Sequence, residues 1–126
     1  MYIPLNANPY ANDTTDCTIR ALSIVLNESW DKIYLDLCAE GYLQKKFGSE
    51  NSVWGAYLFR RGFERIQLPD LCPDCYTVKQ FCEDNPQGNY ILALNGHVVA
   101  VLEGHYFDTW DSGNEVPIYV WGKFYA

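Results

Sequence analysis

Residues 12–23 of the chain read Asn-Asp-Thr-Thr-Asp-Cys-Thr-Ile-Arg-Ala-Leu-Ser, a polar segment that runs directly into an apolar one. Asp13 and Asp16 are residues of a type that caps helices, and the apolar run continues to residue 26. We therefore expect a mostly buried helix over residues 13–27. Cys17 then lies in its first turn, where unpaired N–H groups and the helix dipole favour the thiolate. This position predicts a nucleophile; a small buried core residue is the alternative.

The size and charge of the chain bound what it can do. Its 126 residues predict one domain, residues 1–126, with a sizeable core. The formal charge of −7 argues against nucleic acid or an anionic membrane as a partner, since both attract basic proteins. No apolar run approaches the ~20 residues that cross a bilayer, and the start of the chain lacks the pattern of a signal peptide. A cytoplasmic protein is expected.

Five cysteines, at positions 17, 38, 72, 75 and 82, make an odd number. In a reducing cytoplasm they are expected to be thiols rather than a disulfide framework. Cys72 and Cys75 have the spacing of a zinc site, to which Cys38 or Cys82 could add a third ligand, but a structural site needs four. Ordinary thiols are favoured, and no metal or cofactor is predicted.

Periodicity and turn signals predict helices in the first half of the chain and mostly strands in the second. Ser29 is expected to cap a helix that Gly41 ends, and residues 77–80 read as a capping box. Asn95-Gly96 is a strong hairpin signal, and the strands around it are expected to form a meander. An α+β domain with the helices on one side of an antiparallel sheet follows. The expected helices cover residues 13–27, 29–41, 51–60 and 77–84, the expected strands residues 63–68, 90–94, 97–102, 105–110 and 117–124, and residues 1–12 are expected to run extended over the surface.

Strand pairing identifies a base for the thiol and an acid to orient that base. If residues 103 and 104 form a two-residue turn, His97 and Asp108 lie on the same sheet face, because side chains alternate along a strand. They are then diagonal neighbours, ~7 Å apart at the backbone and close enough for a hydrogen bond. Asp111 falls on the opposite face unless a bulge intervenes, and His105 is a poor partner for Asp108.

These residues match the requirements of covalent acyl transfer. Asp108 would orient His97, His97 would take the thiol proton, and Cys17 would attack a carbonyl. The backbone N–H of Cys17 is one donor for the oxyanion, and the side-chain amide of Asn12 is the expected second donor, with Asn8 as a weaker choice. A histidine bonded at a turn and a carboxylate that caps a backbone N–H are the structural alternatives for His97 and Asp108.

Around these residues, segments at both ends of the chain are similar in sequence to a known family of proteins. They are Asp16-Cys17-Thr18-Ile19-Arg20-Ala21, Gly88-Asn89-Tyr90-Ile91, Gly96 to Val101, Gly104, and Asp108 to Asp111. In these segments the chain resembles papain-like cysteine peptidases, most of all small bacterial and phage proteins of the double-glycine leader peptidase type. The Cys-x-x-Arg-Ala segment is also similar to that of ovarian-tumour deubiquitinases, although their acidic-Gly-Asn approach to the cysteine is missing.

The papain-like resemblance implies a fold in which N-terminal helices pack on a C-terminal antiparallel sheet. It implies Cys17 as nucleophile, His97 as general base and acid, and Asp108 as the orienting residue. The chain departs from the family at Ala11, where papain-like enzymes have a glutamine, and it lacks their Cys-Gly-Ser-Cys-Trp motif. Both departures concern the oxyanion donor.

The predicted function is that of a cysteine peptidase or amide hydrolase that acts on a peptide or protein substrate through a thioester acyl-enzyme. Residues 43–52 and 67–76 are expected to shape its specificity. Acyl transfer by the same triad is one alternative, and an ovarian-tumour-like deubiquitinase is another. A third is an inactive binding protein of the kind that a phage encodes against a host protein, whose aromatic anchors would be Trp54, Trp110, Trp121 and Tyr125.

Overall fold

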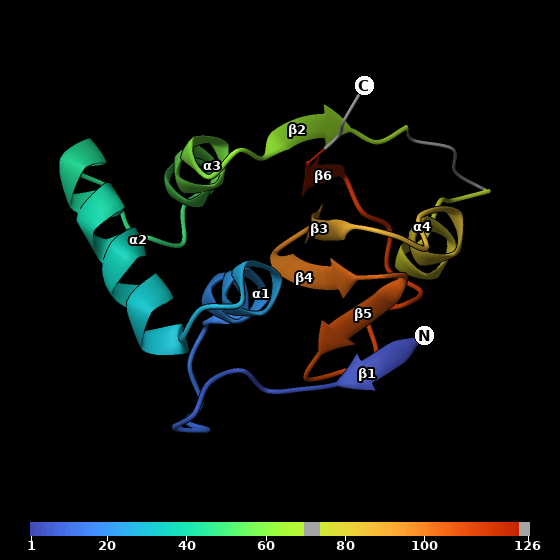
Figure 1. Cartoon of the computed structure of the whole chain (residues 1–126), viewed down its shortest axis with the longest axis horizontal. Coiled ribbons are helices and arrows are strands. Elements are labelled where there is room, and N and C mark those ends of the chain that lie inside the picture. The colour runs from blue at the N-terminus through green and yellow to red at the C-terminus, as the bar shows by residue number, and fades with distance from the viewer. Residues whose placement is uncertain (70–73, 124–126) are drawn as a thin grey trace.

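A mixed six-stranded sheet forms the centre of the computed structural model of the protein, which describes residues 1–69 and 74–123 (Figure 1). Within those residues the strand order is β1-β5-β4-β3-β6-β2, and four helices accompany the sheet. The fold is α+β, as the sequence predicts. The strands are β1 (Tyr2–Pro4), β2 (Glu64–Gln67), β3 (Asn89–Leu94), β4 (His97–Leu102), β5 (His105–Asp108) and β6 (Tyr119–Gly122), and the helices are α1 (Cys17–Leu26), α2 (Trp30–Gln44), α3 (Asn51–Arg60) and α4 (Val78–Asp84).

The hairpins form where the turn signals predict them. Strands β3 and β4 pair in antiparallel fashion around Asn95-Gly96, and β4 pairs with β5 with Leu102 opposite His105. Glu103 and Gly104, between β4 and β5, have φ angles of 48° and 77°. Two successive positive φ angles are what a type I′ hairpin turn requires, so the two-residue turn is confirmed.

Two strands join the sheet differently from the prediction. Strand β6 does not extend the meander, because the connection over residues 109–118 carries the chain back to pair with β3. Strand β1 pairs in parallel with β5, so the sheet is mixed rather than antiparallel and residues 2–4 do not merely lie on the surface. A strand of three residues is too short to show the alternation that identifies strands in a sequence.

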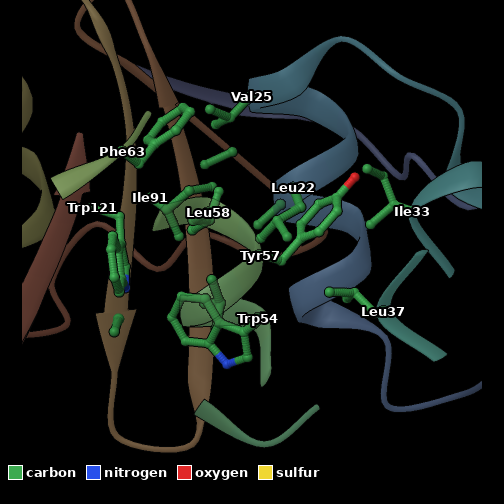
Figure 2. Close-up of a cluster of buried hydrophobic side chains, with 14 of the residues drawn as sticks. Leu22, Val25, Ile33, Leu37, Trp54, Tyr57, Leu58, Phe63, Ile91 and Trp121 are labelled. Carbon is green, nitrogen blue, oxygen red and sulfur yellow. The ribbon is translucent and has the colours of Figure 1, made fainter. Parts of the chain in front are cut away.

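Helices cover both faces of the sheet, which corrects the expectation of a single helical side. Helices α1, α2 and α3 lie on one side and α4 on the other (Figure 1). Figure 2 shows Leu22, Trp54, Ile91 and Trp121 in the larger core, between the first three helices and the sheet. Residues that alternate with these, such as Leu92, face Val78 and Phe81 of α4 on the other side. Apolar residues on both faces make β3 and β4 read as continuous apolar runs.

The helix ends show which capping signals operate. The Ser29 side chain accepts a hydrogen bond from the backbone N–H of Lys32, and residues 77–80 form the predicted capping box. Helix α1 begins at Cys17 rather than at residue 13, and Asp16 at its N-cap makes no side-chain capping bond because its carboxylate binds other donors. Helix α2 continues past Gly41 to Gln44, where Lys45 adopts the left-handed conformation that ends it.

The cysteines do not all remain thiols. Cys17, Cys38 and Cys82 are free, but Cys75 is disulfide-bonded, which corrects the prediction for that residue. Cys72 lies outside the described residues. No group of three or more potential ligands that could hold a metal ion occurs among residues 1–69 and 74–123. Among the same residues, no helix has the length and apolar character needed to cross a membrane.

Candidate active site

Helix α1 brings Cys17 to the sheet at the start of β4. Cys17 is half-buried and is the first residue of α1. The helix begins with the hydrogen bond from the Arg20 N–H to the carbonyl of Asp16, 2.9 Å long, and Asp16 is the residue before Cys17. Cys17 and His97 line the same cavity of about 400 Å³. Val98, the residue after His97, lines this cavity as well. The thiol and the imidazole therefore share one site, as the sequence predicts.

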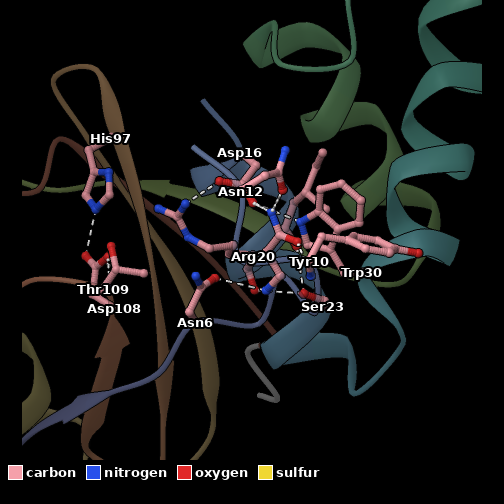
Figure 3. Close-up of polar contacts among 12 residues, drawn as sticks. Asn6, Tyr10, Asn12, Asp16, Arg20, Ser23, Trp30, His97, Asp108 and Thr109 are labelled. Carbon is pink, nitrogen blue, oxygen red and sulfur yellow. Dashed lines mark hydrogen bonds and ion pairs between the residues drawn. The ribbon is translucent and has the colours of Figure 1, made fainter. Parts of the chain in front are cut away.

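His97 and Asp108 form a direct contact. His97 Nε2 lies 2.6 Å from Asp108 Oδ2, the diagonal contact that strand parity predicts (Figure 3). The carboxylate is 5% exposed and has two further donors, the Ser112 hydroxyl at 2.9 Å and the Thr109 N–H at 2.8 Å. Asp111 instead accepts from the Tyr106 hydroxyl, so it is not the partner of the histidine. The hydrogen bonds from Ser112 and Thr109 hold the Asp108 carboxylate in position against His97.

The surroundings of His97 and Cys17 shift their pKa values in opposite directions. Burial lowers the pKa of His97, but hydrogen bonds to Asp108 and to Cys17 outweigh it and raise that pKa to about 9. Burial raises the pKa of Cys17, yet the hydrogen bond and charge of His97, the Val98 backbone and the charge of Arg20 together bring it below its ordinary value. Both shifts favour a thiolate beside an imidazolium.

Trp110 covers the imidazole. Its ring centroid lies 4.9 Å from that of His97, and the indole remains 44% exposed. The other tryptophans proposed as binding anchors are core residues, since Trp54 is 1% and Trp121 9% exposed. Tyr125 lies outside the described residues. Of the three anchors that the structure describes, Trp110 alone is exposed, and it packs on the candidate site itself.

A buried carboxylate that the sequence analysis assigned only to capping fixes the start of α1. Asp16 is 3% exposed, pairs with Arg20, and accepts from the Trp30 indole N–H at 2.9 Å (Figure 3). The Asn8 amide also donates to it, at 3.1 Å. The spacing of Asp16 and Arg20 by four residues was a signal for this ion pair. The contacts from Trp30 and Asn8 are long-range and leave no pattern in the sequence.

The structure does not bring Asn12 into the site. Asn12 is exposed, does not line the cavity of Cys17 and His97, and uses its side-chain oxygen to accept from the Asn8 amide at 2.7 Å. Asn8 also donates to Asp16, so its amide group is occupied as well. In the segment before α1 the two asparagines bond to one another, Asn8 also bonds to Asp16, and neither lines the cavity of the thiol. The cavity contains other polar side chains, which are those of Thr15, Thr18, Ser49, Asn51 and Asn95.

Taken together, Cys17, His97 and Asp108 present a nucleophile, a base and a carboxylate that orients the base. The N–H of Cys17, at the first position of α1, is among the helix N–H groups that have no intrahelical partner. Comparison of the chain with protein-family models, with curated proteins and with solved structures finds no match. The chemistry of the site follows from its geometry and charges.

Proposed function

We propose that the protein is a cysteine hydrolase that cleaves a peptide or amide bond in a peptide or protein substrate through a thioester acyl-enzyme. The observation that carries this proposal is the contact of 2.6 Å between His97 and Asp108, at a cavity that Cys17 and His97 both line and in which His97 lowers the pKa of the thiol. An imidazole has two ring nitrogens. Since Nε2 faces Asp108, Nδ1 remains for the thiol, and one ring can serve both partners.

The reaction follows from these contacts. The Cys17 thiolate attacks the substrate carbonyl, and the resulting oxyanion accepts from the N–H of Cys17 at the helix start. The protonated His97 gives its proton to the leaving amine as the C–N bond breaks, which leaves a thioester on Cys17. His97 then takes a proton from water as the water oxygen attacks the thioester. The C–S bond breaks, the acid product leaves, and the thiolate–imidazolium pair forms again on the enzyme. An amine in place of water would give acyl transfer.

The arrangement of elements supports a papain-like interpretation. The nucleophile opens a helix that packs against the strand that carries the base, and the orienting carboxylate lies on the next strand. In place of the glutamine of that family, Ala11 offers no amide. The polar side chains that line the cavity near the thiol, Thr15 above all because it lies two residues before Cys17, are the substitutes that this structure offers.

Selective alkylation tests the proposal. Iodoacetamide at neutral pH is expected to modify Cys17 faster than the exposed Cys38, as followed by mass spectrometry of peptides, because the thiolate is the reactive form. His97→Ala should abolish this preference, whereas His105→Ala, which removes the other histidine, should leave it unchanged. Equal modification of both thiols in the unaltered protein would overturn the enzyme proposal in favour of a binding protein.

A positive alkylation result then leads to the substrate. A panel of peptides and ubiquitin-like proteins, compared between the unaltered protein and Cys17→Ala, would identify the bond that is cleaved. Cleavage that persists in Cys17→Ala would contradict the assignment of the nucleophile.

A further inference from the structure

A second, mainly apolar cavity of about 190 Å³ adjoins the cavity of Cys17 and His97. The two cavities share Thr15, Thr18 and Ser49, so they meet along one polar edge. The walls of the second cavity come from α1, α2 and the loop before α3. Its apolar lining consists of Ile19, Tyr34, Leu37 and Phe47, with the thiol of Cys38 beside them.

Phe47 at this cavity is a large apolar ring held in water by a fixed loop. It is 82% exposed, yet its backbone N–H donates to the Glu50 carboxylate at 2.6 Å. The next residue, Gly48, packs so closely on α2 that an added Cβ would lie 3.1 Å from the Leu37 Cβ. A ring ordered in advance can contact a ligand without the entropic cost of fixing its loop.

The charges in the two cavities favour an uncharged occupant. Asp16 is the one acidic side chain among the described residues that line either cavity, and it is already paired with Arg20 and bonded by Trp30. His97 is the basic one, and Asp108 balances it. A charged side chain placed in the second cavity would lose its hydration without gaining a partner.

The chemistry of the site assigns the second cavity to one half of the substrate. His97 protonates the leaving amine, so the leaving half lies on the side of the imidazole. The second cavity lies beyond Thr15 and Thr18 and is not lined by His97. We infer that this cavity binds an apolar, uncharged side chain on the acyl side of the scissile bond, with Phe47 as a residue that determines specificity; this inference rests on the proposed hydrolase function.

Dipeptidyl chloromethyl ketones test the inference. In these probes the Cys17 sulfur bonds to the methylene carbon as chloride leaves, and the peptide occupies the acyl side. Probes with leucine, either next to the ketone or one residue before it, are compared with asparagine probes of nearly the same size. Leucine in at least one position is expected to modify Cys17 about tenfold faster than asparagine, because one buried apolar side chain supplies that difference.

Variants locate the effect in the second cavity. Phe47→Ala should slow the leucine probe roughly fivefold, and Cys38→Trp should slow it similarly by filling the cavity. Phe59→Ala removes another exposed aromatic ring, which lines neither cavity, so it should leave the rate unchanged. Each probe rate is divided by the rate of iodoacetamide at Cys17 in the same variant, so that a general change in thiol reactivity does not count as an effect of the cavity. Equal rates for leucine and asparagine, or a leucine rate indifferent to Phe47→Ala, would overturn the inference.

A measurement without chemistry separates this inference from the proposed function. Leucyl-glycine and asparaginyl-glycine amides are titrated into Cys17→Ala, and the amide resonances of Phe47 and Ser49 are followed. Shifts with the leucine peptide alone support the cavity even if Cys17 proves no more reactive than Cys38. Shifts with neither peptide overturn it even if Cys17 proves to be the nucleophile.

Discussion

At the scale of residues, His97 lies between the carboxylate of Asp108 and the thiol of Cys17, and both neighbours raise the pKa of the imidazole. Asp108 is nearly inaccessible and held by Ser112 and Thr109, so it cannot turn away from the imidazole. The proton of His97 is consequently retained up to about pH 9, while Cys17 loses its own below its ordinary pKa. Between these two pKa values the site holds an ion pair, the state in which the thiolate attacks and a proton is ready for the leaving group.

The first prediction concerns the dependence of stability on pH in Cys17→Ser, in which the thiol no longer titrates. The pKa of His97 is above its ordinary 6.5 in the folded protein, chiefly through Asp108 once Cys17 is gone. The folded state then binds more protons than the unfolded state, so this stabilisation is complete below about pH 6.5 and is lost as the pH rises through the folded pKa, which lies below about 9 because the contribution of Cys17 is absent. Urea unfolding across this range should show the decline.

The matched control adds Asp108→Asn to Cys17→Ser. The amide cannot stabilise an imidazolium as a carboxylate does, so the decline between about pH 6.5 and 9 should largely disappear. Identical pH profiles for the two proteins would show that Asp108 does not raise the pKa of His97.

At the scale of elements, the start of α1 decides where the sulfur lies. Asp16 joins α1, through Arg20, to the segment before it, through Asn8, and to α2, through Trp30. These bonds meet at the residue directly before Cys17. The position of the thiol therefore depends on a buried carboxylate that does not itself react.

The second prediction is that Asp16→Ala lowers the free energy of unfolding by about 2–4 kcal/mol, since it leaves a partly buried guanidinium and two donors without their acceptor. It should also reduce the preference of iodoacetamide for Cys17. Asp13→Ala removes an exposed carboxylate from the same segment and should change stability by less than about 0.5 kcal/mol. Urea unfolding and alkylation rates measure both variants, and equal stabilities would contradict the role given to Asp16.

Local signals explain which elements could be predicted. Three features depend only on neighbouring residues, and the structure confirms all of them: the cap at Ser29, the capping box at Thr77 and the turn at Asn95-Gly96. The contact between His97 and Asp108 was predictable because the register across a two-residue turn fixes parity. The structure does not place Asn12 in the lining of the cavity, because its side chain bonds to Asn8 in a contact that no local pattern reveals.

At the scale of the whole molecule, the first strand supports the far side of the candidate site. Strand β1 lies along β5, and the N–H of Leu5 donates to the Asp108 carbonyl at 3.0 Å. The Tyr2 hydroxyl donates to the same carbonyl at 3.2 Å, and its ring stacks on Tyr106. The backbone that carries Asp108 is thus held from the edge of the sheet, by a segment more than a hundred residues away in the chain.

The third prediction follows from this support. Removal of residues 1–5 should lower the free energy of unfolding and slow alkylation of Cys17, because the end of β5 loses its hydrogen-bonded neighbour. A flexible extension placed before Met1 disturbs only the exposed bond from its amino group to Gly104, so it should change neither property appreciably. Urea unfolding and alkylation of both proteins provide the comparison. A truncated protein as stable and as reactive as the full chain would show that β1 does not support the site.

The architecture of the sheet was less predictable than its hairpins. The apolar runs of β3 and β4 indicate buried strands, but they do not reveal that α4 covers the second face. The return of β6 to β3 depends on the path of residues 109–118, which carry no periodic pattern. A sequence specifies neighbouring strands more directly than the order of a sheet, because that order is decided by contacts between distant segments.

The proposed function depends most on the claim that, in the folded protein, Cys17 is a thiolate and His97 carries the proton. The ultraviolet absorbance of thiolate, followed against pH as the difference between the unaltered protein and Cys17→Ala, measures this directly. We predict that Cys17 ionises with a pKa below its ordinary 9.0 and that His97→Ala moves this pKa upward, since burial then acts with less opposition. A thiol that ionises at the same pH with and without His97 would contradict the claim and, with it, the proposed hydrolase.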